Sequence, residues 1–386
     1  METALACCRK GENVFITGPG GTGKSRLILQ IEEEALASGK EVVVCALTGC
    51  AAVLLSRNAT TLHSWAGIGL STGEIRLTKT AQKRWKKTDV LIVDEVSMLS
   101  RELFDVLDDI GKRVRGNDRL FGGIQLVFAG DFFQLPPVNG EFCFKSPKWV
   151  FETVLLTEIF RQKDPVYQKC LNEIRKGVLS KKSYDALCSR VIPSPEGATR
   201  LVPLRSEADA INEAKYKALP AEEHVFEMQV TAGCSETDYL EKHIRVGKIV
   251  RLKVGSRVMC VANILPLLCN GSQGVIVAFR EGFPVVDFYT HTCVVHRHTW
   301  SSGKSKSSVS QIPLAYAWAL TIHKSQGATL DLAEINVGSN VFAAGQIYVA
   351  LSRITALAGL FLNEFDPSKI SVNSDVLKFY EKVTTK

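Results

Sequence analysis

A glycine-rich segment near the start of the chain has the residues needed to hold a triphosphate. Residues 18–25 read GPGGTGKS, which matches the phosphate-loop pattern G-x-x-x-x-G-K-[ST]. Glycines let backbone N–H groups close around phosphates, and the N-terminus of a following helix adds positive potential. The pattern predicts that Lys24 reaches the β- and γ-phosphates and that Ser25 binds Mg²⁺. The expected nucleotide contacts are Gly18, Gly20, Gly21, Thr22, Gly23, Lys24, Ser25 and Arg26.

Two adjacent carboxylates suit the hydrolysis of that nucleotide. Asp94 and Glu95 follow the apolar run 91–93, and ligands of open α/β sheets bind at the carboxyl ends of strands. We expect Asp94 to hold Mg²⁺ through water and Glu95 to orient the attacking water. Adjacent acids after a strand can also serve as helix caps, but their pairing with a phosphate loop favours the catalytic interpretation.

Three further polar residues are placed to act on the γ-phosphate. Gln134 follows the apolar run 126–129 and is suited to sensing that phosphate, although it could simply build a turn with Asp131. Arg161 and Arg353 each come after an apolar run, and phosphoryl transfer needs positive charge at the phosphates. Either arginine could equally be a surface ion-pair residue.

Alternating buried strands and amphipathic helices must position these groups. This alternation, which continues to about residue 160, predicts a parallel α/β sheet. Expected strands are 14–17, 42–47, 90–93 and 126–129, and expected helices are 26–37, 51–56 and 102–114.

The second half of the chain changes character twice. Residues 165–253 are expected to be rich in helix, with a buried strand at 200–204. From 254 to 302 the short apolar runs are β-rich, and Asn270-Gly271 between two of them is a strong hairpin signal. Glu281-Gly282 is a weaker one. These patterns predict a compact β-barrel or meander inserted into an α/β frame.

Composition narrows the class of protein. The 386 residues suffice for two or three domains, and 23% charged with 46% apolar residues is typical of globular proteins. No apolar run reaches the roughly 18 residues of a membrane-spanning helix, so no membrane partner is expected. The 11 cysteines form no CxxC pair, which predicts reduced thiols and no zinc site. A net charge of +7 suits a polyanionic partner without requiring one.

Taken together, the motifs resemble those of the PIF-one-like 5′→3′ DNA helicases, a branch of helicase superfamily one that also includes RecD-type enzymes. The resemblance covers nearly the whole chain and keeps the family's motif order. It rests on the phosphate loop and on residues 46–52 (ALTGCAA), 61–67 (TLHSWAG), 94–98 (DEVSM), 130–136 (GDFFQLP), 160–162 (FRQ), 321–327 (TIHKSQG) and 348–353 (YVALSR).

The resemblance implies two RecA-like P-loop NTPase lobes with parallel sheets and Mg-ATP in the cleft. It assigns γ-phosphate sensing to Gln134, arginine-finger roles to Arg161 and Arg353, and nucleotide coupling to Gly327. It also implies a small Src-homology-three-like β-barrel within the second lobe. The expected boundaries are 1–155 for the first lobe, 156–253 with 306–386 for the second, and 254–305 for the barrel. Residues 70–87 would form a strand-separating wedge, or only a solvated basic loop.

The resemblance also places a track for single-stranded DNA across both lobes. Grip on DNA requires donors to phosphates and aromatic faces for bases. Three of the candidates have simpler interpretations: Thr48 as a helix cap, His63 as a hydrogen-bonded core histidine, and Trp65 as a core aromatic. The expected contacts are Thr48, Gly49, His63, Trp65, Thr321, His323, Lys324 and Ser325.

The activity implied is ATP-dependent 5′→3′ unwinding of forked or structured DNA in genome maintenance. A monomer is expected as the minimal motor, and family members work in the nucleus and the mitochondrion. One departure is that no glutamine precedes Gln30, whereas the family has an adenine-reading glutamine upstream of the phosphate loop. Three alternatives are open: a translocating ATPase that does not unwind, an enzyme preferring RNA, and a non-catalytic P-loop module that binds DNA.

Overall fold

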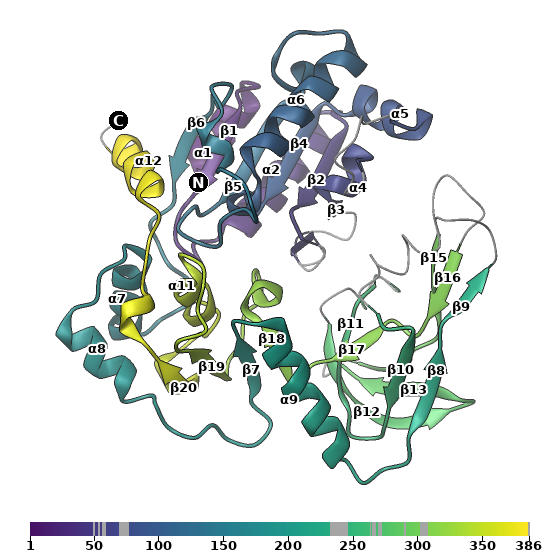
Figure 1. Ribbon diagram of the computed structural model, residues 1–386. Coiled ribbons are helices and arrows are strands. Elements are labelled where there is room, and N and C mark those ends of the chain that lie inside the picture. Colours follow the sequence, from purple (N-terminus) through teal and green to yellow (C-terminus); the bar gives the residue numbers. More distant parts are fainter. Residues whose placement is uncertain are drawn as a thin grey trace. The chain divides into compact units, whose positions relative to one another are not determined.

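A computed structural model shows two compact units, formed by residues 1–196 with 322–386 (unit 1) and by residues 197–321 (unit 2) (Figure 1). No helix within the described ranges is long and apolar enough to cross a membrane. The structure describes residues 1–48, 51–52, 55, 59–68, 77–231, 246–262, 264, 268, 272–288, 291–301 and 308–384.

Unit 1 is built on a six-stranded sheet in the order β3-β2-β4-β5-β1-β6, and its strand pairs are all parallel. The parallel α/β sheet expected from the sequence is therefore confirmed. The central strands β4 and β5 are buried along their whole length, as parallel strands covered on both faces must be. The strands are β1 (Val14–Thr17), β2 (Val42–Ala46), β3 (Thr60–Thr61), β4 (Val90–Asp94), β5 (Gln125–Gly130) and β6 (Glu152–Leu155).

Helices cover both faces of this sheet because successive side chains of a strand point to opposite sides. In β1, Val14 and Ile16 join a core with α1 and α2, whereas Phe15 joins an aromatic core with α6. The helices of this half are α1 (Glu2–Arg9), α2 (Lys24–Ala37), α4 (Leu62–Ala66), α5 (Lys79–Lys87) and α6 (Arg101–Arg115), with 3-10 turns η1 (Val96–Met98), η2 (Leu120–Gly123) and η3 (Cys143–Lys145).

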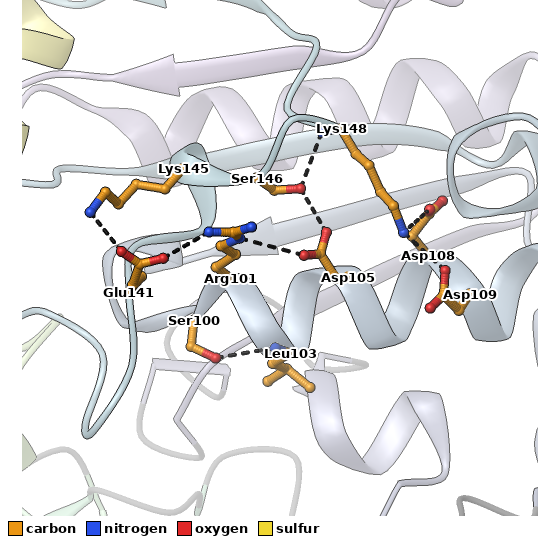
Figure 2. Close-up of polar contacts among 10 residues, drawn as sticks. All are labelled: Ser100, Arg101, Leu103, Asp105, Asp108, Asp109, Glu141, Lys145, Ser146 and Lys148. Atoms are coloured by element: carbon orange, nitrogen blue, oxygen red, sulfur yellow. Dashed lines mark hydrogen bonds and ion pairs between the residues drawn. The ribbon is translucent and has the colours of Figure 1, made fainter.

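Polar contacts fasten the segment 141–148 to α6 (Figure 2). The helix begins at Arg101, and the Ser100 hydroxyl caps it by accepting a hydrogen bond from the Leu103 N–H at 3.1 Å. Arg101 pairs with Glu141 at 2.9 Å, and Lys148 reaches Asp109 at 2.9 Å. Because these side chains are 32–72% exposed and water screens their charges, each pair contributes little to stability.

The remaining elements of unit 1 come from the middle and the end of the chain. Helix α7 begins with Pro165 behind an Asp164 cap, an arrangement typical of helix starts. These elements are α7 (Pro165–Arg175), α8 (Lys181–Cys188), η4 (Ile322–Ser325), β19 (Ala333–Val337), α11 (Gln346–Leu351), η5 (Leu357–Gly359), β20 (Leu360–Phe365), η6 (Pro367–Lys369) and α12 (Ser374–Thr384). Strands β19 and β20 pair in parallel.

Unit 2 is mostly antiparallel, with a five-stranded sheet in the order β14-β13-β12-β11-β17. The expected turn at Glu281-Gly282 joins β12 to β13, and both residues have positive φ. The Asn270-Gly271 turn lies outside the described residues. The elements are β7 (Thr199–Val202), α9 (Arg205–Ala218), β8 (His224–Glu227), β9 (Gln229–Thr231), β10 (Ile249–Leu252), β11 (Arg257–Cys260), β12 (Gln273–Arg280), β13 (Phe283–Asp287), β14 (Thr292–Val294), β15 (His298–Ser301), β16 (Ser308–Gln311), β17 (Leu314–Tyr316) and β18 (Ala319–Thr321).

The helices expected between residues 165 and 253 are present as α7, α8 and α9, but the strands β8, β9 and β10 in the same span were not expected. Along β10 the burial alternates from one residue to the next, which is the period of a half-buried strand rather than of a helix. The expected strand at 200–204 is present as β7, which pairs in parallel with β18.

Candidate active site

The phosphate loop connects β1 to α2, as the motif requires. Gly21 and Gly23 both have φ of 83°, a left-handed conformation that favours glycine. A Cβ atom at Gly18 would overlap the Leu156 carbonyl oxygen, and one at Gly21 would lie 2.5 Å from the Arg161 Cβ. The Thr22 hydroxyl donates to the Pro19 carbonyl at 2.9 Å. These positions therefore need glycine for reasons of conformation and of space.

Lys24 is the first residue of α2, and its ammonium group points back over the loop. The Nζ atom donates to the carbonyls of Gly18 at 2.7 Å and Pro19 at 2.9 Å. Burial lowers the pKa of Lys24, although the carboxylates of Asp131 and Glu95 oppose this shift. A half-buried cation of this kind, held at the N-terminus of a helix, suits a phosphate.

Asp94 and Glu95 are both buried at the carboxyl end of β4. Burial, together with the charge of Glu95, raises the pKa of Asp94 to about 7, while Ser25 and Lys24 act in the opposite direction. A divalent cation would relieve this repulsion, so the pair fits Mg²⁺. Within the described part of the chain no cluster of three or more His, Cys, Asp or Glu side chains could hold a metal alone. That is consistent with Mg²⁺, which is commonly shared between one or two carboxylates and the substrate phosphates.

The backbone of Glu95 is in an unusual conformation. Its φ of 57° lies in the left-handed region, which a glutamate seldom adopts. The Glu95 N–H donates to Asp94 Oδ1 at 2.8 Å, and Glu95 Oε2 accepts from Gln326 Nε2 at 2.9 Å. The carboxylate is thereby held in one orientation, which a group that positions a water molecule needs.

A cavity of about 440 Å³ brings most of the expected catalytic residues together in unit 1. The Oε1 atom of Gln134 is buried there without a hydrogen-bond partner among the described residues, so it can receive a donor such as water. The expected site residues that line this cavity are Gly20, Gly21, Thr22, Gly23, Lys24, Ser25, Arg26, Asp94, Glu95, Gln134, Arg161, Gly327 and Arg353.

Both expected arginines lie beside the phosphate loop, since a Cβ atom at Gly20 would be 3.6 Å from Arg353 Nη2 and one at Gly21 would be 2.5 Å from Arg161 Cβ. Arg353 is 2% exposed, and its guanidinium donates to the carbonyl of Val349 and the hydroxyl of Ser352, both at 2.9 Å. Arg161 Nη1 donates to the Ser352 carbonyl at 3.0 Å. Burial and the charge of Arg353 lower the pKa of Arg161 to about 10. Two neighbouring cations held by neutral groups provide positive charge for a phosphate.

Sequence reasoning missed three residues that position this site. Gln326 holds Glu95, and the Tyr348 hydroxyl accepts from the Gly20 N–H at 2.8 Å. Arg175 binds Asp131 through two hydrogen bonds of 2.8 and 2.9 Å. Gln326 and Tyr348 belong to the motifs 321–327 and 348–353, so membership in these motifs was the available signal. Arg175 carried no signal beyond its place at the end of a helix.

The residues expected to contact DNA have mixed placements. The Thr48 hydroxyl accepts from the Ala51 N–H at 3.2 Å and so caps a helical turn, while Gly49 lies outside the described residues. His63 on α4 is half-buried, and burial lowers its pKa. Thr321, His323 and Lys324 are partly exposed, whereas Ser325 is buried, with its hydroxyl donating to the Ile322 carbonyl.

For Trp65 the expected stacking face is not available. Its ring is 2% exposed and packs against Trp85 with centroids 4.4 Å apart. The simpler interpretation of Trp65 as a core aromatic therefore holds, because burying a large ring against another aromatic stabilises the core.

Replacing Gln326 by methionine is expected to reduce kcat for ATP hydrolysis about 10-fold with little change in KM. The substitution keeps the volume but removes the hydrogen bond to Glu95, and bonds to charged groups are worth roughly 1.5–3 kcal/mol. Steady-state phosphate release measures both constants. The matched control is Gln30→Met, which removes an exposed glutamine–glutamate hydrogen bond of 3.3 Å to Glu34. Equal effects of the two variants would show that Gln326 does not position Glu95.

Family models match two parts of the chain. The model described as PIF1-like helicase matches residues 3–181, and the 2B domain of DNA helicase Pif1 matches residues 240–279. The ATP-dependent DNA helicase PIF1 of Homo sapiens is 38% identical over 98% of this chain, and that of Emericella nidulans is 34% identical over 98%. The chain spans 63% and 62% of the lengths of these two relatives.

Solved structures extend the similarity to the whole fold. Pif1 helicase from Candida albicans superposes with a TM-score of 0.92 at 34% identity, covering 99% of this chain and 98% of that one. Bacteroides Pif1 bound to ssDNA gives a TM-score of 0.81 at 30% identity, covering 99% and 95%. The site geometry, the family models and this full-length structural match agree, and the chain therefore belongs to the PIF1-like helicase family.

Proposed function

We propose that this chain is an ATP-dependent 5′→3′ DNA helicase that moves along single-stranded DNA. The observation that carries the proposal is the cavity of about 440 Å³ in which Lys24, Glu95 and Arg353 converge. A binding module without catalysis would have no need for a fixed carboxylate in one cavity with half-buried and buried cations. Relatives in this family are named ATP-dependent DNA helicases, which supports the same activity.

The arrangement accounts for hydrolysis by position and charge. Glu95, oriented by Gln326, would direct the attacking water and receive its proton. Gln134 would detect the γ-phosphate, and Lys24 with the two arginines would neutralise charge that develops on it. Mg²⁺, held beside Ser25 and Asp94, would supply further positive charge at the β- and γ-phosphates.

The nucleic-acid partner is proposed from the family and from the partly exposed donors Thr48, His63, Thr321, His323 and Lys324; Gly49 and Ser325 are assigned from the family alone. Structures of Bacteroides Pif1 were solved with ssDNA, and with ADP-AlF3 and ssDNA. We assign phosphate contacts on this chain to Thr48, Gly49, His63, Thr321, His323, Lys324 and Ser325. We further propose that strands β11 to β14 form the core of a Src-homology-three-like barrel at 254–305; β17, which pairs with β11, follows this range. From the family we also propose lobes at 1–155 and at 156–253 with 306–386, and a strand-separating wedge at 70–87.

The expected catalytic residues of one chain line a single cavity, so we propose a monomer as the minimal motor. A related structure is described as forked dsDNA unwound by two coordinating Pif1 helicases, so assembly at a fork is a separate question. The proposed compartments are the nucleus and the mitochondrion.

Duplexes with a 5′ or a 3′ single-stranded tail test the proposal directly. The 386-residue chain with Mg-ATP should unwind the 5′-tailed duplex and leave the 3′-tailed one intact. Phosphate release should rise on addition of single-stranded DNA, with Lys24→Ala as the inactive blank. Stimulated hydrolysis without unwinding would indicate a translocase, and stronger stimulation by RNA would change the substrate. If neither single-stranded DNA nor RNA stimulates phosphate release, the proposal is refuted.

A further inference from the structure

Phe342, in the loop between β19 and α11, is a large aromatic side chain left in solvent. It is 63% exposed, which makes it the most exposed aromatic residue of those described. Single exposed apolar side chains are common and need no explanation by themselves. Phe342 differs because its backbone is fixed and its ring faces another ring.

Buried groups hold the loop around Phe342 in place. The N–H groups of Phe342 and Ala343 donate to Gln346 Oε1 at 3.1 and 3.3 Å, and Gln346 is fully buried. Val341 is 5% exposed, and its N–H donates to the Gly338 carbonyl at 3.2 Å. The ring is therefore presented to solvent by an ordered loop, which makes it available for contact at low entropic cost.

The partner ring is His323 of the segment 321–327. The two centroids are 5.8 Å apart and the planes differ by 10°, so the rings are stacked. Burial lowers the pKa of His323, which favours the neutral imidazole. A parallel pair of this kind can be extended by a third flat ring, and unpaired bases stack on aromatic faces in this way.

The same loop is joined to the nucleotide site. A Cβ atom at Gly345 would meet the carbonyls of Phe133 and Gln134, so the end of the loop packs directly on the γ-phosphate sensor. Helix α11 follows, where Tyr348 contacts the Gly20 N–H, and Arg353 comes two residues after the helix ends. A ligand stacked on the Phe342 ring would thus bind to a segment that contacts both Gln134 and the phosphate loop.

We propose that Phe342 is a base-stacking residue for single-stranded DNA, extending the His323 stack. This inference rests on the proposed function, since it requires a chain that binds DNA. It adds a contact with a base rather than with a phosphate. Stacking depends little on sequence because every base has an aromatic face.

Binding of fluorescein-labelled oligothymidylate, followed by anisotropy, tests the proposal. Phe342→Ala should weaken binding about 5- to 100-fold, whereas Phe342→Trp should bind like the parent. The slope of log K against log salt should not change, because no phosphate contact is lost. Leu36→Ala, which trims another apolar side chain that is 53% exposed, is the matched control and should leave binding unchanged.

Oligonucleotides with one abasic position, moved along the strand, locate the base. In the parent, removing the stacked base should cost as much affinity as Phe342→Ala, and in the variant the same lesion should cost nothing further. Thermal unfolding of both proteins verifies that the variant is folded. Normal binding by Phe342→Ala, or equal sensitivity of both proteins to every abasic position, would overturn the inference and leave the helicase proposal intact. Failure of the parent to bind oligothymidylate would instead refute the proposed function.

Discussion

Arg353→Ala is expected to slow ATP hydrolysis by about 10³-fold or more, with nucleotide affinity changed far less. An arginine at the γ-phosphate stabilises charge that develops mainly in the transition state, and such residues are worth roughly 10³–10⁵ in rate. Arg353 is 2% exposed and is held by the Val349 carbonyl and the Ser352 hydroxyl. Burial lowers its pKa, so the fold maintains a desolvated cation that an incoming phosphate can neutralise. Single-turnover phosphate release with saturating Mg-ATP and single-stranded DNA measures the loss.

Comparing the loss of hydrolysis rate with the loss of nucleotide affinity shows whether Arg353 acts in catalysis or only in binding. A fluorescent, non-hydrolysable ATP analogue should bind the variant within about 10-fold of the parent, because the arginine stabilises the transition state more than the bound nucleotide. Arg353→Lys should restore little, since an ammonium lacks the forked donors of a guanidinium. Arg119→Ala, which removes an exposed arginine of unit 1, is the control and should retain full activity. Equal losses in affinity for this ATP analogue and in rate would show that Arg353 only binds nucleotide.

The parts of this site that could be predicted from the sequence are those whose residues belong to contiguous motifs. The phosphate loop, the pair Asp94 and Glu95, and the strands before them follow from local patterns, because ligands collect at the carboxyl ends of parallel strands. Gln134 and Arg353 were expected from their positions after apolar runs and from the family resemblance. The structure places these groups around one cavity.

The parts that could not be predicted depend on contacts between distant segments. Tyr380 of α12 lies beside the Thr17 hydroxyl at the end of β1, and its own hydroxyl accepts from the Phe132 N–H at 3.2 Å. Thr17 and Phe132 are 363 and 248 positions away from Tyr380 in the sequence, so no local periodicity predicts these contacts. Trp65 shows the opposite failure: its motif suggested a DNA contact, but packing against Trp85 buries it.

Arg175→Ala is expected to lower the free energy of unfolding by about 3–5 kcal/mol, because it leaves a buried carboxylate without its ion-pair partner. Asp131 is fully buried and accepts both of the hydrogen bonds that the Arg175 side chain donates to it. The guanidinium also lies 4.3 Å from the centroid of the Phe133 ring. Burial alone would lower the pKa of Arg175, but Asp131 raises it above its ordinary value, so the guanidinium remains charged. Urea unfolding followed by tryptophan fluorescence measures the change.

Comparison with an exposed ion pair and with a double variant isolates the cause of this loss. Arg101→Ala breaks a pair with Glu141 of the same 2.9 Å length on α6 (Figure 2), but its side chains are 41% and 44% exposed, so it should cost about 1 kcal/mol or less. Arg175→Met combined with Asp131→Asn removes both charges and should cost less than Arg175→Ala alone, since no carboxylate is left unpaired. If Arg175→Ala costs no more than Arg101→Ala, the buried pair does not stabilise the fold.

The same substitution should also affect ATP hydrolysis. Gln134 follows Asp131 by three residues, and its N–H donates to the Asp131 carbonyl at 2.8 Å, so Arg175→Ala should lose ATP hydrolysis as well as stability. Arg101→Ala should retain ATP hydrolysis. This contrast would show that the buried pair supports both the stability of unit 1 and the position of Gln134, its γ-phosphate sensor.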